Sequence, residues 1–353
     1  MRLLLITPSL SSNSLGRTYC LYLLAASLGW ESETWSIAGD RVWGPLAGDA
    51  FAETCFRAPS DEAEAIETLT ARAKQVDLIL AVKPVPESLG LAWRIHRATG
   101  VPMISDIDDP DIEVLLAAGQ PLKALGKRLL RPGVVRTAKR MSSTAALVPR
   151  IVSNPELQRL HGGTVIPHVR DVLPARSPSR GGGGFHVAFV GSVQPHKGIQ
   201  VLRRAIDALA SEGYSLTVTA AAPEDRRPHE RWIGQTTLEE GLELVASADA
   251  IVIPSLPTPW SRGQLPVKLV DAMMLGVCVI VSDIAPLPWA VGDAGVIVQP
   301  GRVSSLVDAL RALRDPAERA RRSVLLADLA HSRYTVGVNR RIFEQVCVDA
   351  LRH

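Results

Sequence analysis

Residues 187–198 read VAFVGSVQPHKG and decide how the second half of the chain is built. An apolar run ends at Gly191, a polar turn follows, and a helical pattern begins just after Lys197. A Walker loop would place a glycine directly before the lysine and Ser or Thr directly after it, so that motif is excluded. The stretch instead predicts a strand whose carboxyl end brings a polar turn and one lysine to the start of a helix.

The helix that follows has its apolar residues on one face. They recur at steps of three and four, at Ile199, Leu202, Ile206 and Leu209. Free N–H groups and a partial positive charge at the start of this helix would favour a phosphate group. A lysine–phosphate contact contributes roughly 1.5–3 kcal/mol and the helix dipole roughly 0.3–1 kcal/mol, so Lys197 would dominate. The alternative is an ordinary surface lysine beside a helix start.

Short apolar runs bounded by turn residues recur along the whole chain. In the first half they cover 3–8, 77–82, 101–106 and 164–168, and in the second half 186–191, 214–220, 250–255, 278–283 and 295–300. Stretches with helical spacing separate these runs. The alternation predicts an α/β protein with parallel sheets that are covered by helices on both faces.

A chain of 353 residues exceeds what one hydrophobic core usually supports, so two domains are expected. Prolines and the four glycines at 181–184 mark a linker. We therefore predict a Rossmann-like domain at 1–172, a linker at 173–184 and a second Rossmann-like domain at 185–335, facing across a cleft. A C-terminal helix at 336–353 would cross back to the first domain. Its apolar residues near one face are Val338, Ile342, Val346 and Leu351.

The composition narrows the class of protein. Hydrophobic residues make up 46% of the chain and charged residues 21%, which indicates a globular protein rather than a disordered one. The net charge of +3 is too small to indicate a nucleic-acid partner. Four widely spaced cysteines suggest neither a zinc site nor disulfides, and no apolar run approaches the roughly 20 residues that span a bilayer. We expect a cytoplasmic protein.

A second constellation lies in RGQLPVKLVDAMMLGVCVIVSD at 262–283. Pro266 suits the first position of a helix, and Gly276 suits its end before a buried strand. Lys268 and Asp271 are three residues apart and would share one helical face. There an amine can meet a diphosphate and a carboxylate can accept hydrogen bonds from a ribose diol. The alternative is an ordinary ion pair within the helix.

Four blocks of the second half resemble, in order and spacing, the donor-domain blocks of family 4 glycosyltransferases, which have the GT-B fold. The blocks are VGSVQPHKG, IGQTTLEEGLELVASADAIVIPS, LPVKLVDAMMLGVCVIVSD and GVIVQPGRVSSLVDALRAL, and they cover almost all of 185–335. In the first half, LLLITPSL with Gly16 and the segment SNPELQRLHGGTVIPHVRD at 153–171 resemble the family more weakly. The resemblance implies an enzyme that transfers a sugar from a nucleoside diphosphate donor, of UDP or GDP type, to an acceptor hydroxyl. It also implies retention of anomeric configuration and no metal or other cofactor.

The same resemblance implies a set of binding residues. Lys197 and Lys268 would hold the diphosphate, and Asp271 would bind the ribose. Gly16 would bring backbone N–H groups close to the phosphates. The loop expected to form the pocket for the base contains Gly234, Gln235 and Thr236.

Two positions depart from the family pattern. Ser192 stands where an arginine is usual, and Gly263 stands where a glutamate is usual. One phosphate cation and one donor-sugar contact are therefore missing. We expect Arg262 to replace the missing charge, and Ser261 or Gln264 to reach the donor sugar. The alternative for Arg262 is a mobile arginine at the rim.

The stretch VPMISDIDDPD at 101–111 ends a predicted strand with four aspartates. Asp106 or Asp108 is the candidate for the catalytic group that orients the acceptor hydroxyl. Two alternatives are an Asp-x-Asp metal motif, as in another glycosyltransferase fold, and helix capping by Asp108 or Asp109. No histidine lies at 104–111, so the group that handles the proton is not identified.

The segment between Val114 and Pro155 has no Asp or Glu. Its basic residues are Lys123, Lys127, Arg128, Arg131, Arg136, Lys139, Arg140 and Arg150. Such a segment could contact an anionic membrane surface through 123–140, at the inner face of the membrane, or bind a phosphorylated acceptor. We favour the alternative, a solvated pair of basic helices separated at Pro132.

Two other functions fit the same fold. A GT-B epimerase or phosphorylase would share the site, and a non-catalytic protein that binds nucleotide sugars could keep the fold without the chemistry. Ser192 and Gly263 are the reasons to consider the second. The expected partners are a nucleotide sugar and a hydroxyl acceptor, which is a polysaccharide, a lipid-linked intermediate or a small natural product.

Overall fold

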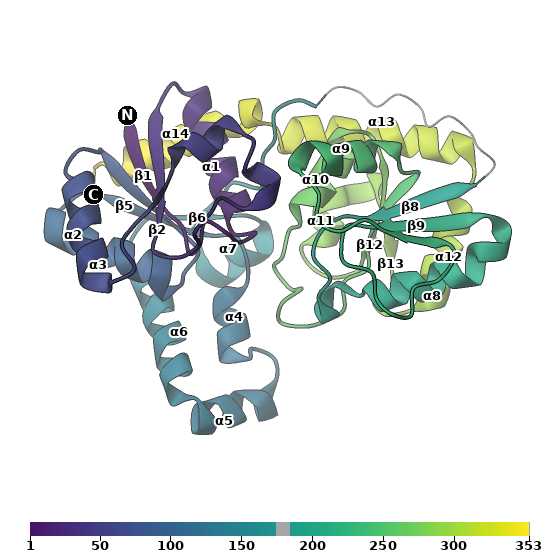
Figure 1. Cartoon of the computed structure of the whole chain (residues 1–353), viewed down its shortest axis with the longest axis horizontal. Coiled ribbons are helices and arrows are strands. Elements are labelled where there is room, and N and C mark those ends of the chain that lie inside the picture. The colour runs from purple at the N-terminus through teal and green to yellow at the C-terminus, as the bar shows by residue number, and fades with distance from the viewer. Residues whose placement is uncertain (174–183, 353) are drawn as a thin grey trace. The chain divides into compact units, whose positions relative to one another are not determined.

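The computed structural model describes residues 1–173 and 184–352. The chain divides into two compact units, one of Met1–Val169 with Val336–His353 and the other of Arg170–Thr335. Each unit is built on one parallel sheet with helices around it (Figure 1). The predicted α/β class with two Rossmann-like sheets is therefore confirmed. The predicted linker at 173–184 lies almost entirely outside the described residues.

The first unit has seven strands in the order β3-β2-β1-β4-β5-β6-β7, with every neighbouring pair parallel. The strands are β1 (Arg2–Ile6), β2 (Glu31–Ser36), β3 (Cys55–Arg57), β4 (Leu78–Val82), β5 (Met103–Ile107), β6 (Arg150–Val152) and β7 (Thr164–Val165). In the central strands β4 and β5 every residue is buried, as expected for a parallel sheet that is covered on both faces. All carboxyl ends meet at one edge, so the residues after β1, β4 and β5 come together there.

Helices cover both faces of the first sheet. They are α1 (Leu15–Ser27), α2 (Glu62–Ala73), α3 (Leu91–Thr99), α4 (Asp111–Leu116), α5 (Pro121–Leu130), α6 (Pro132–Ala145), α7 (Pro155–His161) and α14 (Val336–Ala350). One core cluster contains residues of α2, α3 and α6, and the other contains residues of α1 and α14. The start of α2 is fixed by its N-cap residue: the Asp61 side chain accepts hydrogen bonds from the N–H groups of Ala63 and Glu64.

The buried face of α14 differs from the predicted one. Val338, Ile342 and Leu351 are exposed by 45%, 41% and 41%. The buried residues of this helix are Val336, Asn339, Phe343, Cys347 and Ala350. The prediction was wrong because the face toward the core includes a polar and a small residue, which an apolar pattern does not count.

The second unit has six parallel strands in the order β10-β9-β8-β11-β12-β13. The strands are β8 (Phe185–Phe189), β9 (Tyr214–Val218), β10 (Glu230–Trp232), β11 (Ala250–Ile253), β12 (Cys278–Ser282) and β13 (Val296–Val298). The helices are α8 (Ile199–Leu209), α9 (Leu238–Ser247), α10 (Val267–Met274), α11 (Leu287–Val291), α12 (Val303–Ala312) and α13 (Pro316–Arg333). Helices α8 and α12 pack into one core cluster, and α9, α10, α11 and α13 into the other.

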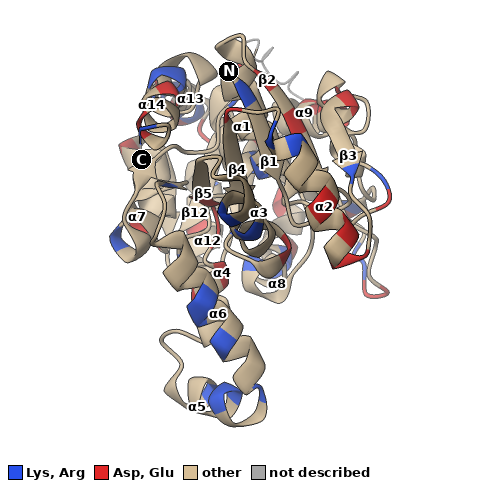
Figure 2. Cartoon of the chain, turned by 90° about the vertical axis from the view of Figure 1, so that its left-hand side faces the viewer, with Lys and Arg blue, Asp and Glu red and all other residues tan. Residues whose placement is uncertain are grey.

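Helices α4, α5 and α6 form an arm that projects from the first unit, with α5 across its tip (Figures 1 and 2). Helix α4 packs on α6, and α5 packs on the start of α6. No helix within the described part of the chain has the length and the apolar character that crossing a bilayer requires.

Candidate functional site

The turn after β8 provides space for a side chain from another element. Gly191 has φ +118°, in the region that L side chains rarely adopt. A Cβ atom at this position would lie 1.8 Å from Nζ of Lys268, which comes from α10. The Gly191 N–H donates to Oγ1 of Thr219 at 2.6 Å, which fixes the turn. A glycine is therefore required here so that the Lys268 amine can lie against the backbone.

Lys197 reaches the same turn. Its Nζ donates to Oγ of Ser192, the residue next to Gly191, at 2.8 Å. Burial, reinforced by the charge of Lys197, lowers the pKa of Lys268 to about 7, while Asp271 opposes this change. Among the described residues, no carboxylate lies within ion-pair distance of the Lys268 amine, which lies 5.8 Å from the centre of the Phe189 ring. Two amines at one turn favour a ligand with several negative charges.

Asp271 lies one turn after Lys268 on α10, but its ion pair is with another residue. Nε of Arg170 lies 2.8 Å from Oδ1 of Asp271, and both side chains are buried. Burial raises the pKa of Asp271, although Arg170 and Lys268 act against this shift. The alternative of a simple Lys268–Asp271 ion pair is therefore wrong. Arg170 lies within the family-like segment 153–171, but the sequence predicted no role for it.

The loop before α10 explains one departure from the family pattern. Gly263 has φ +89°, so a glutamate there would be strained. Arg262 is exposed, and Gln264 is half-buried. The Ser261 side chain is only 2% exposed and its hydroxyl donates to the carbonyl of Leu256, which corrects the expectation that it reaches the donor sugar.

This loop lies against the Lys197 turn. The rings of His196 and Trp260 stack with their centres 5.9 Å apart, and the N–H of Leu256 donates to the carbonyl of His196 at 2.8 Å. Arg262 follows Trp260 by two residues, so its exposed guanidinium belongs to the same edge of the second unit.

The loop with Gly234, Gln235 and Thr236 joins β10 to α9. A Cβ atom on Gly241 of α9 would lie 3.4 Å from Oγ1 of Thr236 and 4.0 Å from Cγ1 of Val190. This loop therefore lies near the end of β8. Helix α9 starts with a capping box, in which Thr237 and Glu240 bond each other's N–H groups.

Gly16 lies in the first unit, in the first turn of α1. A Cβ atom there would be 3.7 Å from Cζ3 of Trp43. All other predicted donor-site residues lie in the second unit: Lys268 and Asp271 on α10, and the rest between β8 and α8 or in the loops before α9 and α10.

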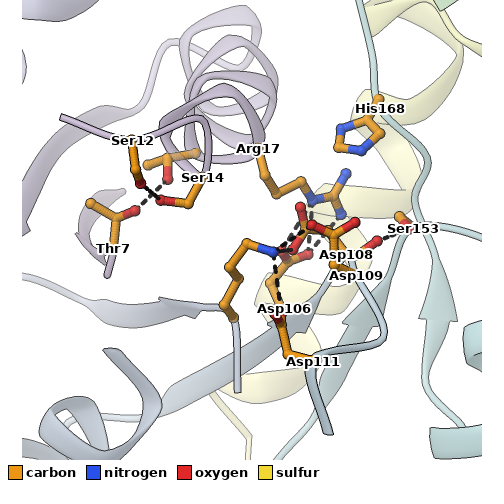
Figure 3. A network of polar contacts seen from close by, with 12 residues as sticks. Thr7, Ser12, Ser14, Arg17, Asp106, Asp108, Asp109, Asp111, Ser153 and His168 are labelled. Carbon is orange, nitrogen blue, oxygen red and sulfur yellow. Dashed lines mark hydrogen bonds and ion pairs between the residues drawn. The ribbon is translucent and has the colours of Figure 1, made fainter. Parts of the chain in front are cut away.

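At the carboxyl edge of the first sheet, Asp106 forms a buried ion pair with Arg17 of α1 (Figure 3). Nε of Arg17 lies 3.1 and 3.0 Å from the two carboxylate oxygens, and Nη2 lies 2.6 Å from Oδ1. The guanidinium also donates to the carbonyls of Ile166 and Pro167, both at 2.9 Å. Burial alone would lower the pKa of Arg17, but Asp106 raises it. Asp106 is 0% exposed, so it positions Arg17 and does not contact an acceptor, which corrects half of the catalytic prediction.

Lys83 follows β4 and is the centre of an acidic cluster at the same edge, formed by Asp108, Asp109 and Asp111. Its Nζ lies 3.1 Å from Asp108, 2.7 Å from Asp109 and 3.2 Å from Asp111. Burial on its own would lower the pKa of Lys83, but the three carboxylates raise it well above its usual value. Lys83 also has φ +71°, which is a strained conformation for a lysine. Strained residues of this kind cluster at functional sites.

Asp108 differs from its neighbours because it is almost completely buried. It is 4% exposed, and burial raises its pKa to about 7, although Lys83 acts against this shift. The backbone carbonyl of Asp108 accepts a hydrogen bond from Ser153 at 2.8 Å. Helix α4 has Pro110 as its N-cap without a side-chain cap, so the capping alternative for Asp108 or Asp109 is wrong.

Within the described residues, no group of three or more His, Cys, Asp or Glu side chains is arranged to hold a metal ion. The two carboxylates of the Asp-x-Asp alternative have separate cationic partners: Asp106 pairs with Arg17 and Asp108 with Lys83. His168 is 4% exposed and lies at the same edge, with Nδ1 3.7 Å from Sγ of Cys20 (Figure 3). Sequence reasoning missed Arg17, Lys83 and His168. The sequence around these residues gives no local signal of their role.

Comparison with known proteins shows that part of the second unit is similar to a family of transferases. Residues 184–315 match the family model of the glycosyl transferases group 1. The O-antigen chain mannosyltransferase B of Escherichia coli is 30% identical over 150 residues, a match that spans 38% of this chain and 38% of that protein.

Solved structures resemble the whole chain. Sucrose-phosphate synthase from Thermosynechococcus elongatus has a TM-score of 0.76 at 16% identity, covering 100% of this chain and 99% of that one. HepE of Anabaena, solved in complex with UDP and glucose, has a TM-score of 0.75 at 16% identity, covering 98% and 99%. The resemblance to glycosyltransferases is thereby confirmed: the chain has the fold of the GT-B glycosyltransferases, and its residues 184–315 match the family model of the glycosyl transferases group 1.

Proposed function

We propose that this protein transfers a sugar from a nucleoside diphosphate sugar, of UDP or GDP type, to an acceptor hydroxyl with retention of anomeric configuration. The observation that carries the proposal is the pair of amines at the Gly191 turn. Lys197 and Lys268 both reach this turn, and the charge of Lys197 helps to lower the pKa of Lys268. A diphosphate would relieve this repulsion.

The two lysines would act most strongly when the donor bond breaks. Negative charge then builds up on the leaving diphosphate, and preorganised cations at that point stabilise the transition state more than the ground state. Each charge-assisted contact contributes about 1.5–3 kcal/mol. Arg262 would add a third cation from the adjacent loop, in place of the family arginine that Ser192 replaces.

Asp271 and the loop at 234–236 would bind the nucleoside. Asp271 is held by Arg170, so its carboxylate has a fixed direction, and a ribose diol would have to share or displace that contact. Gly234, Gln235 and Thr236 would read the base largely through backbone groups. Gln264 is the remaining candidate for the donor sugar.

Asp108 is the proposed group that receives or orients the acceptor proton. A carboxyl group with a pKa near 7 exchanges protons efficiently at neutral pH. Lys83 holds the carboxylates of Asp109 and Asp111 beside it and so fixes the local charge. The acceptor would bind the first unit and the donor the second.

A screen of nucleotide sugars tests the proposal. A donor at 100 times its dissociation constant should stabilise the protein by about 2.7 kcal/mol, which a thermal unfolding assay detects. The stabilising donor is then incubated with candidate acceptors, and the anomeric configuration of any product is determined by NMR.

Retention in the product is the expected result. An inverted product would refute the retaining mechanism alone. Donor binding without release of nucleoside diphosphate to any acceptor or to water would instead indicate a non-catalytic binding protein. Release of an isomerised or phosphorolysed sugar would indicate an epimerase or a phosphorylase.

A further inference from the structure

Helix α5 exposes four leucines at the tip of the arm. Leu122, Leu125, Leu129 and Leu130 are exposed by 85%, 55%, 72% and 84%, and no residue of this helix is buried. A single exposed leucine is ordinary, but four in ten residues form a patch that needs an explanation. The interpretation favoured from the sequence, a solvated pair of basic helices, would leave this patch in water.

The leucines lie on one side of the helix. Leu122, Leu125 and Leu129 are separated by three and four residues and therefore share a face, with Leu130 at its border. The basic residues Lys123 and Arg128 flank this face on either side. The arrangement is that of a helix that lies in an interface, with an apolar face below and cations at its margins.

The charge of α5 and α6 has one sign. The segment from 114 to 155 has no acidic residue, and Figure 2 shows basic positions along the ribbon of α5 and α6. Arg131, Arg136, Lys139 and Arg140 are all exposed. A surface that accepts this arm must therefore be anionic.

The arm is a folded element that holds α5 in place. Helix α6 buries Val135, Ala138, Met141 and Ala145, so its inner side belongs to the first unit. Nζ of Lys127 donates to the carbonyls of Val114 and Leu115 at 2.7 and 3.2 Å, which ties α5 to the end of α4. The leucine face is thus presented outward without an unfolding step.

We infer that α5 is an attachment site for an anionic lipid bilayer. The four leucines enter the boundary between head groups and acyl chains, and Lys123, Arg128 and Arg131 contact lipid phosphates. A second copy of the chain is a poor occupant, because a symmetric contact through α5 would bring the same cations together. The inference does not depend on the proposed function, since lipid binding is measured without any substrate.

Flotation with lipid vesicles tests this inference. At low salt the full chain should float with vesicles of phosphatidylcholine and phosphatidylglycerol, and stay in solution with phosphatidylcholine alone. Leu122→Gln with Leu129→Gln should lower the partition coefficient by roughly tenfold or more for each leucine. Lys123→Gln with Arg128→Gln should lower it by about fivefold for each charge.

Matched controls are available in the same unit. Leu147, which is 69% exposed, and the exposed Lys74 lie outside the arm, so Leu147→Gln and Lys74→Gln should leave binding unchanged. All variants change exposed side chains and should keep the wild-type melting temperature. The inference is overturned if wild type stays in solution with anionic vesicles at low salt. It is equally overturned if the double leucine variant floats like wild type. Wild type that forms α5-dependent oligomers and does not bind vesicles would also overturn it.

Discussion

Lys268 should take up a proton when a diphosphate binds. In the free protein, burial and the nearby charge of Lys197 lower the pKa of its amine to about 7, and Asp271, which is paired with Arg170, only partly opposes this. A diphosphate against the amine would return its pKa toward the ordinary value of 10.5. Binding and protonation are then linked, and the sign is fixed: the protonated amine binds and the neutral one does not.

The size of the pH effect on diphosphate affinity follows from the lowered pKa of Lys268. Below pH 7 the amine is already charged, so Lys268 contributes no pH dependence there. Above pH 7 the affinity should fall by up to tenfold per unit, which gives about 10-fold at pH 8 and about 100-fold at pH 9, or about 1.4 kcal/mol per unit. The second ionisation of the ligand phosphate lies at about 6 and does not interfere in this range.

Isothermal titration with UDP and GDP at pH 7 to 9, in two buffers of different ionisation enthalpy, measures both quantities. Uptake of about 0.9 proton is expected at pH 8, because only about one amine in ten is charged in the free protein at that pH. Lys268→Arg is the matched control, since a guanidinium stays charged and should abolish the uptake and the slope. A flat affinity for wild type, or the same slope for the arginine variant, would refute the reasoning.

Three further predictions concern single side chains. Gly191→Ala should displace the Lys268 amine and lower nucleoside diphosphate affinity at least tenfold by titration, whereas Gly48→Ala, with open space around it, should not; equal affinities would mean that the turn is not the phosphate site. Asp106→Asn leaves a buried arginine without its carboxylate and should cost about 3–5 kcal/mol, a fall of about 10 °C in melting temperature by calorimetry; a near-neutral change would argue against the buried pair. Asp108→Asn should lower turnover about 10²–10⁴-fold without affecting donor binding, and wild-type turnover should rise with pH through about 7 as this carboxyl ionises; an unchanged profile would remove Asp108 from the chemistry.

The central strands were predictable because their burial leaves a clear pattern. In a parallel sheet covered on both faces, strands such as β8, β11 and β12 read as continuous apolar runs. The edge strand β10, with the sequence ERW, and β2, with the sequence ESETWS, were missed since they are short or carry polar residues. These segments are strands because they pair with neighbouring strands of the sheet, and not because of an apolar pattern in their own sequence.

The donor side of the site was easier to predict than the acceptor side. Lys197 lies in a turn and Lys268 near the start of a helix. The order of these elements along the chain predicts that the two lysines lie close together. Arg17 lies in the first turn of α1, and Lys83 is a lone lysine after a strand, so neither has a local signal of its role. Both meet the aspartates only because parallel strands end at one edge of the sheet. The resemblance to the family marked Gly263 only as a missing glutamate, and it gave no sign of the positive φ that favours glycine at this position.

The most direct test of the account compares nucleoside diphosphates with nucleosides as ligands of Lys197→Met and Lys268→Met. Each substitution should weaken UDP or GDP binding by about 10- to 100-fold, since each removes one charge-assisted contact. Uridine or guanosine binding should stay unchanged, because neither lysine would touch the base or the ribose. An equal loss for both kinds of ligand, or no loss for the diphosphates, would contradict a phosphate site at the Gly191 turn.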